Sequence, residues 1–334
     1  MRVLSEADVA ALITIPDALA CAELAYRLHA TGEASPPVRG DLRHDHPKAG
    51  CLLLAGAWGA QHLAVKSNVH AYPEGPDAPR LWGSLLSLWD WSRATPRAML
   101  AARLLNDHRT AAGFGVAARL LSHADSTRLA VFGAGKSAPM TIRYLKAVRP
   151  AIRQVMLAGR SAARVEALAR SVAAWPEFAD VVVGIATSPA AAVEDADIIA
   201  TVTTSDHPVF PGSAVRPGAC VILGGANRPA AREADDDLMR RADVYVDARQ
   251  GALDKAGDLK LAIASGALTP ERILAEIGAC SEGAPGLSRG SDLRVFKSMG
   301  LAIQDVVLAE HLVTLAEQTG VGTVVDLDGG SGGP

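Results

Sequence analysis

Residues 5–33 carry apolar side chains at the spacing of amphipathic helices. Ser5 and Asp8 match a capping box, in which a hydroxyl and a carboxylate satisfy free backbone N–H groups at a helix start. The apolar pattern breaks at the sequence TIPDA, where Pro16 follows Thr14 and suits the first turn of a new helix. The pattern therefore predicts two helices in this segment.

Between residues 36 and 102 the pattern changes to short apolar runs separated by Gly and Pro. Runs of this length, bounded by turn residues, are typical of strands, and here they predict an antiparallel or mixed sheet. Residues 106–123 return to helical spacing and are rich in Ala, which predicts a helix leading into the next domain.

From residue 128 onward, apolar runs alternate with helical segments such as 136–148 and 161–173. Short buried strands that alternate with helices predict a parallel, doubly wound sheet. The segment 291–318 holds one long amphipathic helix, which we expect to pack on the first domain rather than to join this sheet. The strands expected in the sheet are residues 128–132, 153–158, 181–185, 197–202, 219–223 and 243–247.

These patterns predict an α/β protein in which a Rossmann dinucleotide-binding domain is inserted into a discontinuous α+β domain. A chain of 334 residues is long enough for two such domains. The discontinuous domain is expected to comprise residues 1–122 and 300–322, and the Rossmann domain residues 123–299. The glycine-rich end, residues 323–334, is expected to be a flexible tail.

Charge, hydropathy and cysteine content narrow the functional classes. The 33 basic and 36 acidic side chains nearly balance, so neither nucleic acid nor an anionic membrane is an expected partner. No apolar run reaches the roughly 18 to 20 residues of a membrane span, and a cytoplasmic protein is predicted. The 4 cysteines lie far apart without a CxxC pair, which predicts reduced thiols and no metal site.

The stretch VFGAGKSA, residues 131–138, contains a Gly-Lys-Ser that is also found in the phosphate loops of nucleotide hydrolases. Such a loop requires a glycine five residues before Gly135, but that position is Ala130, inside the predicted strand. The dinucleotide pattern GxGxxA fits instead, directly after a strand and opening a helix whose free N–H groups attract a pyrophosphate. The cofactor-binding residues predicted in this turn are Gly133, Gly135, Lys136, Ser137 and Ala138, of which Lys136 and Ser137 are expected in the first helical turn.

The end of the second predicted strand distinguishes the two nicotinamide dinucleotides. A site for NAD(H) has an acid there that binds the ribose hydroxyls. This sequence has Arg160 and Ser161, with Arg164 a turn later. A cation and a hydroxyl suit the additional phosphate of NADP(H), so NADP(H) is favoured over NAD(H), although Arg160 can also be a solvated residue at a helix start. Thr203 and Thr204, after the fourth strand, are further predicted cofactor contacts.

Segments along most of the chain resemble the ornithine cyclodeaminase and mu-crystallin family. The segment NDHRTAAGFGVAARLL precedes VFGAGKSA, as an RTAA helix start precedes the dinucleotide strand in that family. Further segments that resemble the family are PPVR, AVKSNV, DIIATVTTSDHPVF, GGANRPAAREADDDLMRRADVYVD and VFKSMGLAIQD. The resemblance implies a Rossmann domain, a discontinuous domain that binds substrate and dimerises, and therefore a homodimer.

The resemblance also implies a substrate site. In the family, the residues that match Arg39, Lys66 and Arg109 bind the carboxylate and neighbouring groups of an amino or imino acid. This chemistry is reasonable, because a guanidinium grips a carboxylate with two hydrogen bonds and a lysine in an apolar strand needs an anionic partner. The alternatives are a surface position for Arg39 and core-edge salt bridges for Lys66 and Arg109. Met299, in the closing segment, is a predicted cofactor contact.

The residue type at position 227, here Asn227, distinguishes the cyclodeaminase activity of the family from the reductase activity. The cyclodeaminase branch has an acid at this position, whereas an amide accepts no proton near neutral pH. A reductase is less demanding, because a cyclic imine protonates readily and a side chain that hydrogen-bonds the ring nitrogen suffices. Lys66 and Asn227 are therefore the predicted catalytic residues, with a role as a turn residue before Arg228-Pro229 as the alternative for Asn227.

We predict an NAD(P)H-dependent oxidoreductase that reduces a cyclic imino acid, 1-pyrroline-2-carboxylate or 1-piperideine-2-carboxylate, to proline or pipecolate. The alternatives are an ornithine or lysine cyclodeaminase, an amino-acid dehydrogenase, and a non-catalytic NADP(H)-binding protein of the crystallin kind. The family's Met-Pro pair near the lysine strand is replaced here by LLLAGAW, which keeps the non-catalytic alternative open.

Overall fold

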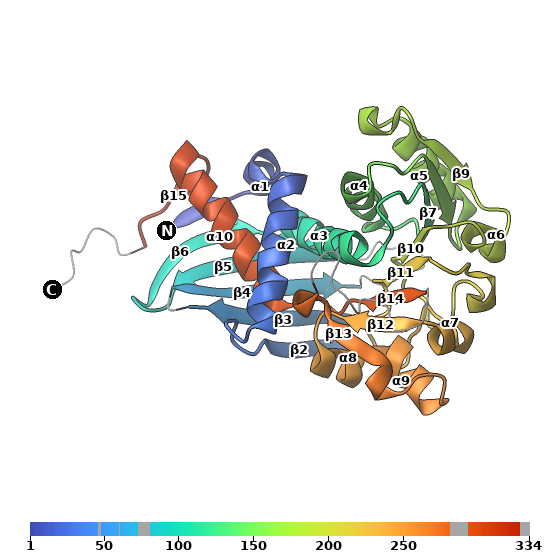
Figure 1. The fold of residues 1–334 in the computed structure, drawn as a ribbon. Coiled ribbons are helices and arrows are strands. Elements are labelled where there is room, and N and C mark those ends of the chain that lie inside the picture. The colour runs from blue at the N-terminus through green and yellow to red at the C-terminus, as the bar shows by residue number, and fades with distance from the viewer. Residues whose placement is uncertain (46–47, 60, 73–80, 281–292, 328–334) are drawn as a thin grey trace. The chain divides into compact units, whose positions relative to one another are not determined.

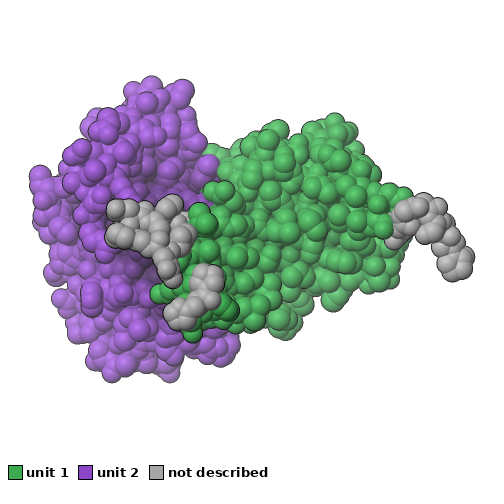
Figure 2. Space-filling view, turned by 180° about the vertical axis from the view of Figure 1, so that it is seen from behind, with its two compact units in different colours: residues 1–110, 301–334 green, residues 111–300 purple. Residues whose placement is uncertain are grey.

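The structure, a computed structural model, describes residues 1–45, 48–59, 61–72, 81–280 and 293–327. The chain forms two compact units, coloured separately in Figure 2. Unit 1 comprises residues 1–110 and 301–334, and unit 2 comprises residues 111–300. The division falls within helix α3 (Arg103–Leu121), upstream of the boundary expected at residue 122, so this one helix contributes residues to both units.

Unit 1 is built on a seven-stranded mixed sheet with the order β15-β1-β6-β5-β4-β3-β2. Only the β1 and β6 pair is parallel; the other neighbours are antiparallel. The elements of this unit, besides the start of α3, are β1 (Arg2–Leu4), α1 (Glu6–Leu12), α2 (Ile15–Ala30), β2 (Val38–Asp45), β3 (Lys48–Trp58), β4 (His62–Ala71), β5 (Leu81–Asp90), β6 (Thr95–Ala101), α10 (Ala302–Thr319) and β15 (Thr323–Val324).

Helices α2 and α10 pack against each other, and α10 also packs on β3, β4 and β5 (Figure 1). Strand β4 shows why one face of the sheet receives these helices. Ala64, Lys66 and Asn68 are buried, while Val65 and Val69 between and beyond them are exposed. Successive residues of a strand point to opposite faces, so β4 presents one face to the helices and the other to solvent. The predicted packing of the C-terminal helix within this part of the chain is confirmed.

The predicted helix signals at the N-terminus are confirmed. Ser5 and Asp8 form a capping box at the start of α1, and the Thr14 hydroxyl caps α2 by accepting from the N–H of Asp17. The flexible tail expected from residue 323 was wrong at its start, because Thr323 and Val324 pair with β1 as a short strand. Two residues carry no periodicity that a sequence pattern can show. The last residues of the expected tail, 328–334, lie outside the described residues.

Unit 2 is built on an eight-stranded sheet, entirely parallel, with the order β13-β12-β14-β11-β10-β7-β8-β9. Its elements are β7 (Arg128–Phe132), α4 (Ala138–Val148), β8 (Gln154–Ala158), α5 (Ala162–Ala173), β9 (Val182–Ile185), α6 (Pro189–Val193), β10 (Ile198–Thr201), β11 (Cys220–Leu223), α7 (Asp236–Arg241), β12 (Asp243–Val246), α8 (Arg249–Lys255), α9 (Gly257–Ala264), β13 (Ile273–Glu276) and β14 (Arg294–Lys297). The predicted doubly wound α/β architecture is therefore confirmed.

All six strands predicted for this sheet are present, but two further strands, β13 and β14, were missed. Strand β14 lies inside the segment 291–318, for which only a helix was predicted, and it pairs with β11 on one side and β12 on the other. Its four residues are too few to show a period before the helical pattern that follows. Every residue of β10, β11 and β12 is buried, as expected for central strands of a parallel sheet covered on both faces.

The described part of the chain contains no single helix that is long and apolar enough to cross a membrane. Helices α1 and α2 together have the required length and composition, but they bend by 92° at their junction, and α2 packs on α10.

Candidate functional site

The turn after β7 has the backbone geometry that the dinucleotide pattern requires. Gly133 has a φ of +110°, and a Cβ at this position would lie 2.8 Å from the carbonyl oxygen of Val202. Only glycine fits both the backbone conformation and the close approach. At Gly135, by contrast, a Cβ would meet no described atom within 4 Å, so the absence of a side chain leaves open space beside the turn. A diphosphate can approach the backbone there.

The helix after this turn begins without a side-chain cap, while the Ala138 N–H donates to the Gly135 carbonyl oxygen at 3.2 Å and Pro139 has no N–H. Helix α4 begins at Ala138, two residues later than predicted, with Ser137 as its N-cap residue. The prediction that Lys136 and Ser137 lie in the first helical turn was therefore wrong; they form the turn that precedes it. The Ser137 side chain makes no capping hydrogen bond, and Ala138 is fully buried. A helix start without a side-chain cap is suited to bind an anion.

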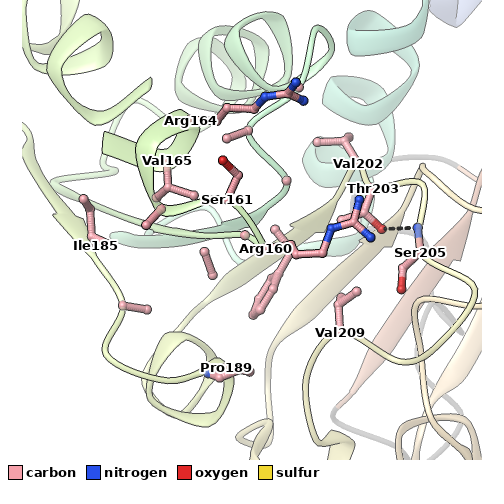
Figure 3. Close-up of a pocket in the computed structure, with 18 of the residues that line it drawn as sticks. Arg160, Ser161, Arg164, Val165, Ile185, Pro189, Val202, Thr203, Ser205 and Val209 are labelled. Atoms are coloured by element: carbon pink, nitrogen blue, oxygen red, sulfur yellow. Dashed lines mark hydrogen bonds between the residues drawn. The ribbon is translucent and has the colours of Figure 1, made fainter. Parts of the chain in front are cut away.

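A pocket of about 640 Å³ opens along this turn within unit 2. Its walls come from the turn after β7, the start of α5, the segment after β9 and the loop after β10 (Figure 3). The volume is in the range of small-molecule and cofactor sites. The predicted cofactor residues that line it are Gly133, Gly135, Arg160, Ser161, Arg164, Thr203 and Thr204. The lining includes neither the other predicted cofactor residues, Lys136, Ser137, Ala138 and Met299, nor the predicted catalytic residue Asn227.

The three residues predicted to select NADP(H) lie together at the start of α5. Arg160, Ser161 and Arg164 are all exposed, and Figure 3 shows Arg160 reaching over the pocket and Arg164 at its edge. Ser161 is the N-cap residue of α5 and makes no side-chain capping bond. No acid follows β8, where an NAD(H) site has one.

Asn227 and Met299 lie outside the lining of the pocket. Asn227 is exposed, in the turn after β11. Met299 follows β14, and its N–H donates to the buried Asp247 carboxylate at 2.6 Å. Burial raises the pKa of Asp247, while hydrogen bonds from Gly300, Met299 and other donors act in the opposite direction.

Unit 1 contains a second group of predicted residues, centred on Lys66. The side chain of Lys66 is 1% exposed and lies on the helix-covered face of β4. Its ammonium donates to the Asp305 carboxylate at 2.7 Å and to the Asn106 side-chain oxygen at 3.1 Å. The Nζ of Lys66 also lies 2.7 Å from the second oxygen of Asp305.

Arg109 and Arg39 add positive charge to the same group. The Arg109 guanidinium donates to the Asn106 oxygen at 2.7 Å, and its Nε lies 3.3 Å from Asp305. Arg39 on β2 faces the same side of the sheet, because it is paired with Leu54, which in turn is paired with Lys66. Its Nε is buried without a hydrogen-bond partner among the described residues. We call Arg39, Lys66, Asn106, Arg109 and Asp305 the cation cluster.

The cation cluster contains three cations and one carboxylate, and this imbalance affects the lysine. Burial lowers the pKa of Lys66 to about 8, and the charges of Arg109 and Arg39 lower it as well, while Asp305 opposes them. Most Lys66 side chains thus stay protonated at neutral pH. The excess positive charge makes the cluster suited to hold an anionic ligand.

Asn106 and Asp305 were not predicted, although both lie in segments that carried the family resemblance. Asn106 is three residues before Arg109 on α3, a spacing that puts two side chains on one helix face. Asp305 lies in the first turn of α10 and comes from the far end of the chain. The helical spacing was a usable signal for Asn106, but no local pattern indicates a partner more than 230 residues away.

Comparison with known proteins identifies the family. The model of the ornithine cyclodeaminase/mu-crystallin family matches residues 1–319. The chain belongs to this family. It is 32% identical to a Delta(1)-pyrroline-2-carboxylate reductase of Paracoccus denitrificans over 270 residues, which are 80% of this chain and 84% of the relative. It is also 32% identical to the mouse ketimine reductase mu-crystallin over 273 residues, 78% and 79% of the two chains.

A solved structure of similar fold comes from Thermococcus litoralis. This Delta(1)-pyrroline-2-carboxylate reductase, in complex with NADH and L-proline, has a TM-score of 0.87 and 26% sequence identity. The match covers 97% of this chain and 100% of the Thermococcus litoralis chain. The predicted family and the predicted Rossmann fold are both confirmed.

Proposed function

We propose that this protein is an NAD(P)H-dependent reductase of cyclic imino acids, which converts 1-pyrroline-2-carboxylate or 1-piperideine-2-carboxylate into proline or pipecolate. The observation that carries the proposal is the cation cluster, which offers several donors for a carboxylate in a buried part of unit 1. Relatives named Delta(1)-pyrroline-2-carboxylate reductase and ketimine reductase, and a similar structure that holds NADH and L-proline, support the same reaction.

The cluster residues divide the work of binding. Arg109 and Arg39 hold the substrate carboxylate, since a guanidinium presents two parallel donors to it. Lys66 adds positive charge beside the carboxylate and is the proposed proton donor. Asp305 and Asn106 hold the lysine and Arg109 in place, because each of them contacts both side chains. Fixing the substrate in one orientation is itself a large part of catalysis.

The pocket of unit 2 fits a dinucleotide. The φ of Gly133, the open space at Gly135 and the uncapped start of α4 together suit a diphosphate. When bound, reduced nicotinamide supplies the hydride for the carbon of the C=N bond. Arg160 and Ser161 favour NADP(H), since a guanidinium and a hydroxyl can hold a 2′-phosphate. Asn227 hydrogen-bonds the imine nitrogen in this proposal, and it does not serve as the proton acceptor that a cyclodeaminase needs.

The reaction is tested with purified protein, each of the two imines and either NADPH or NADH, by absorbance of the reduced nicotinamide between about pH 5 and 9. We expect oxidation of NADPH together with formation of proline or pipecolate, identified by amino-acid analysis. Release of ammonia from ornithine or lysine without net cofactor turnover would instead indicate a cyclodeaminase. Tight NADPH binding without turnover of any imine would favour the crystallin-like alternative.

The cofactor preference is tested with Arg160→Asp, which places an acid where an NAD(H) site has one. We expect the ratio of kcat/KM for NADPH to that for NADH to fall by roughly 10- to 100-fold, as the loss of a charge-assisted contact predicts. Arg170→Asp, at the other end of the same helix and exposed, is the matched control and should leave the ratio unchanged. An unchanged ratio in the Arg160 variant would show that Arg160 does not bind the 2′-phosphate.

We extend the proposal to a homodimer formed through the open face of the unit 1 sheet. The side chains on that face include exposed apolar residues from neighbouring strands, and the register places Leu42, Cys51 and Val69 in one row and Leu53, Ser67 and Leu85 in the next. Contiguous apolar surface of this kind is typical of an interaction site. Changing Val69 and Leu85 together to Lys should give a monomer by light scattering, whereas Val182→Lys, an exposed position in unit 2, should not.

A further inference from the structure

Glu233 is a fully buried acid in unit 2 that none of the steps above uses. Its carboxylate accepts four hydrogen bonds from two neighbouring strand ends. One oxygen accepts from the N–H and the hydroxyl of Thr203, at 2.8 and 2.7 Å. The other accepts from the N–H groups of Gly225 and Ala226, at 2.7 and 3.0 Å. One side chain thus joins the loop after β10 to the turn after β11.

The loops that Glu233 joins border one particular half of the dinucleotide pocket. The chain runs outward from β7 through β8 to β9 and then returns to place β10 on the other side of β7. At such a switch point the two nucleotide halves lie on opposite sides. Arg160 follows β8 and belongs to the adenosine side, so Thr203, which follows β10, borders the nicotinamide side. The backbone carbonyl of Glu233 also accepts from the N–H of Val209, another residue that lines the pocket.

The charge of Glu233 is not neutralised by a cation. Each of its four partners is an N–H or O–H donor, which suits the ionised carboxylate. The nearby Lys297 forms its ion pair with Asp258 at 2.9 Å instead, and both are fully buried. Across the described residues, no salt bridge reaches Glu233. A negative charge therefore lies buried next to the loop that borders the nicotinamide side.

We propose that Glu233 is a positioning residue for the nicotinamide half of the cofactor and that its charge favours the oxidised, cationic ring over the reduced, neutral ring. This inference rests on the proposed function only in so far as the pocket binds a nicotinamide dinucleotide. The positioning acts through Thr203 and the turn at Gly225, because the N–H groups of both residues donate to the Glu233 carboxylate. Gly225 has no room for a side chain, since a Cβ there would clash with the Thr203 backbone and the Glu233 side chain.

The test measures dissociation constants of NADP⁺, NADPH and 2′,5′-ADP by fluorescence or calorimetry on the full chain, without any imine. In Glu233→Gln, we expect the ratio of the NADP⁺ to the NADPH dissociation constant to rise about tenfold, as loss of a unit charge in a poorly screened interior predicts. Binding of 2′,5′-ADP, which lacks the nicotinamide half, should stay within about twofold. Glu233→Asp keeps the charge but not the reach, so both dinucleotides should bind less tightly while their ratio is preserved.

Asp235→Asn is the control for a purely structural effect. Asp235 caps α7 and accepts from the N–H of Gly212, so its variant should lower thermal stability without changing the ratio. A Glu233→Gln protein with lower stability but an unchanged ratio would overturn the role of the charge. If Glu233→Gln does not fold, Thr203→Val tests the positioning: unchanged affinity for both dinucleotides would overturn it. Wild-type protein that binds NADPH but reduces no imine would contradict the proposed function alone.

Discussion

Each unit of the molecule buries a lysine against an aspartate, and the two pairs differ in their surroundings. In unit 1, Lys66 lies 2.7 Å from Asp305, and the two side chains are 1% and 4% exposed. In unit 2, Lys297 lies 2.9 Å from Asp258, and neither side chain is exposed. By distance and burial alone the two pairs would be assigned the same role.

The neighbours of each pair indicate different roles. Lys297 donates to the Ala226 carbonyl, and Asp258 accepts from the N–H groups of Glu233 and Ala234. This pair therefore fixes backbone groups of unit 2. Lys66 and Asp305 lie among two further cations, and their common charge is positive. A buried ion pair is weak evidence for function by itself. In unit 1, the excess positive charge of Arg109 and Arg39 next to the pair is the feature that indicates an anionic ligand.

Replacing Lys66 with Met is expected to have the largest effect. The change removes a donor and a positive charge from the substrate site, so kcat/KM for the imine should fall by roughly 10³-fold. The NADPH dissociation constant should not change, since the pocket lies in unit 2. Lys48→Met, an exposed position on the neighbouring strand β3, is the matched control. Activity of the Lys66 variant within tenfold of wild type would show that both pairs are structural.

Replacing Lys297 with Met should act on stability instead. It leaves Asp258 charged and buried without its partner, so the free energy of unfolding should fall by about 3–5 kcal/mol, measured by urea denaturation. Adding Asp258→Asn should recover about half of this loss or more, because the remaining oxygen still accepts from Glu233 and Ala234. A double variant as unstable as the single one would contradict this explanation.

The pH dependence of activity should follow Lys66. Its pKa of about 8, lowered first by burial, means that the ammonium is lost above that pH. We expect kcat/KM for the imine to fall about tenfold per pH unit above this value, while NADPH affinity stays flat. Stability has the opposite sign: between about 8 and the 10.5 of an ordinary lysine, the unfolded chain binds more protons, so this residue's contribution to the free energy of unfolding rises with pH.

Changing Asp305 to Asn should give the smallest of these effects and the most specific one. Asp305 is the group that raises the pKa of Lys66 against burial and the neighbouring arginines. Without its charge, the alkaline limb of kcat/KM should move about one pH unit lower, measured from complete pH profiles of both proteins. A limb that stays in place would mean that another group controls it.

The sequence predicted local features better than distant partnerships. The Gly133 turn was predictable because a strand, a glycine and a helix start lie within a few residues of each other. Lys66 and Arg109 were found through family resemblance, not through periodicity. Asp305 was missed because all of unit 2 lies between it and Lys66 in the sequence. Glu233 was missed because a buried acid that accepts from backbone N–H groups has no sequence pattern.

Strand β4 also limits how this protein can evolve. Lys66 faces the helices, and Val65 and Val69 face the open side of the sheet, so one short segment supplies both a substrate contact and a proposed dimer surface. Substitutions can change either surface separately. Inserting or deleting a single residue would exchange the two faces, exposing the ammonium and burying side chains of the outer surface. Among homologues, β4 should therefore vary in composition while its length stays constant.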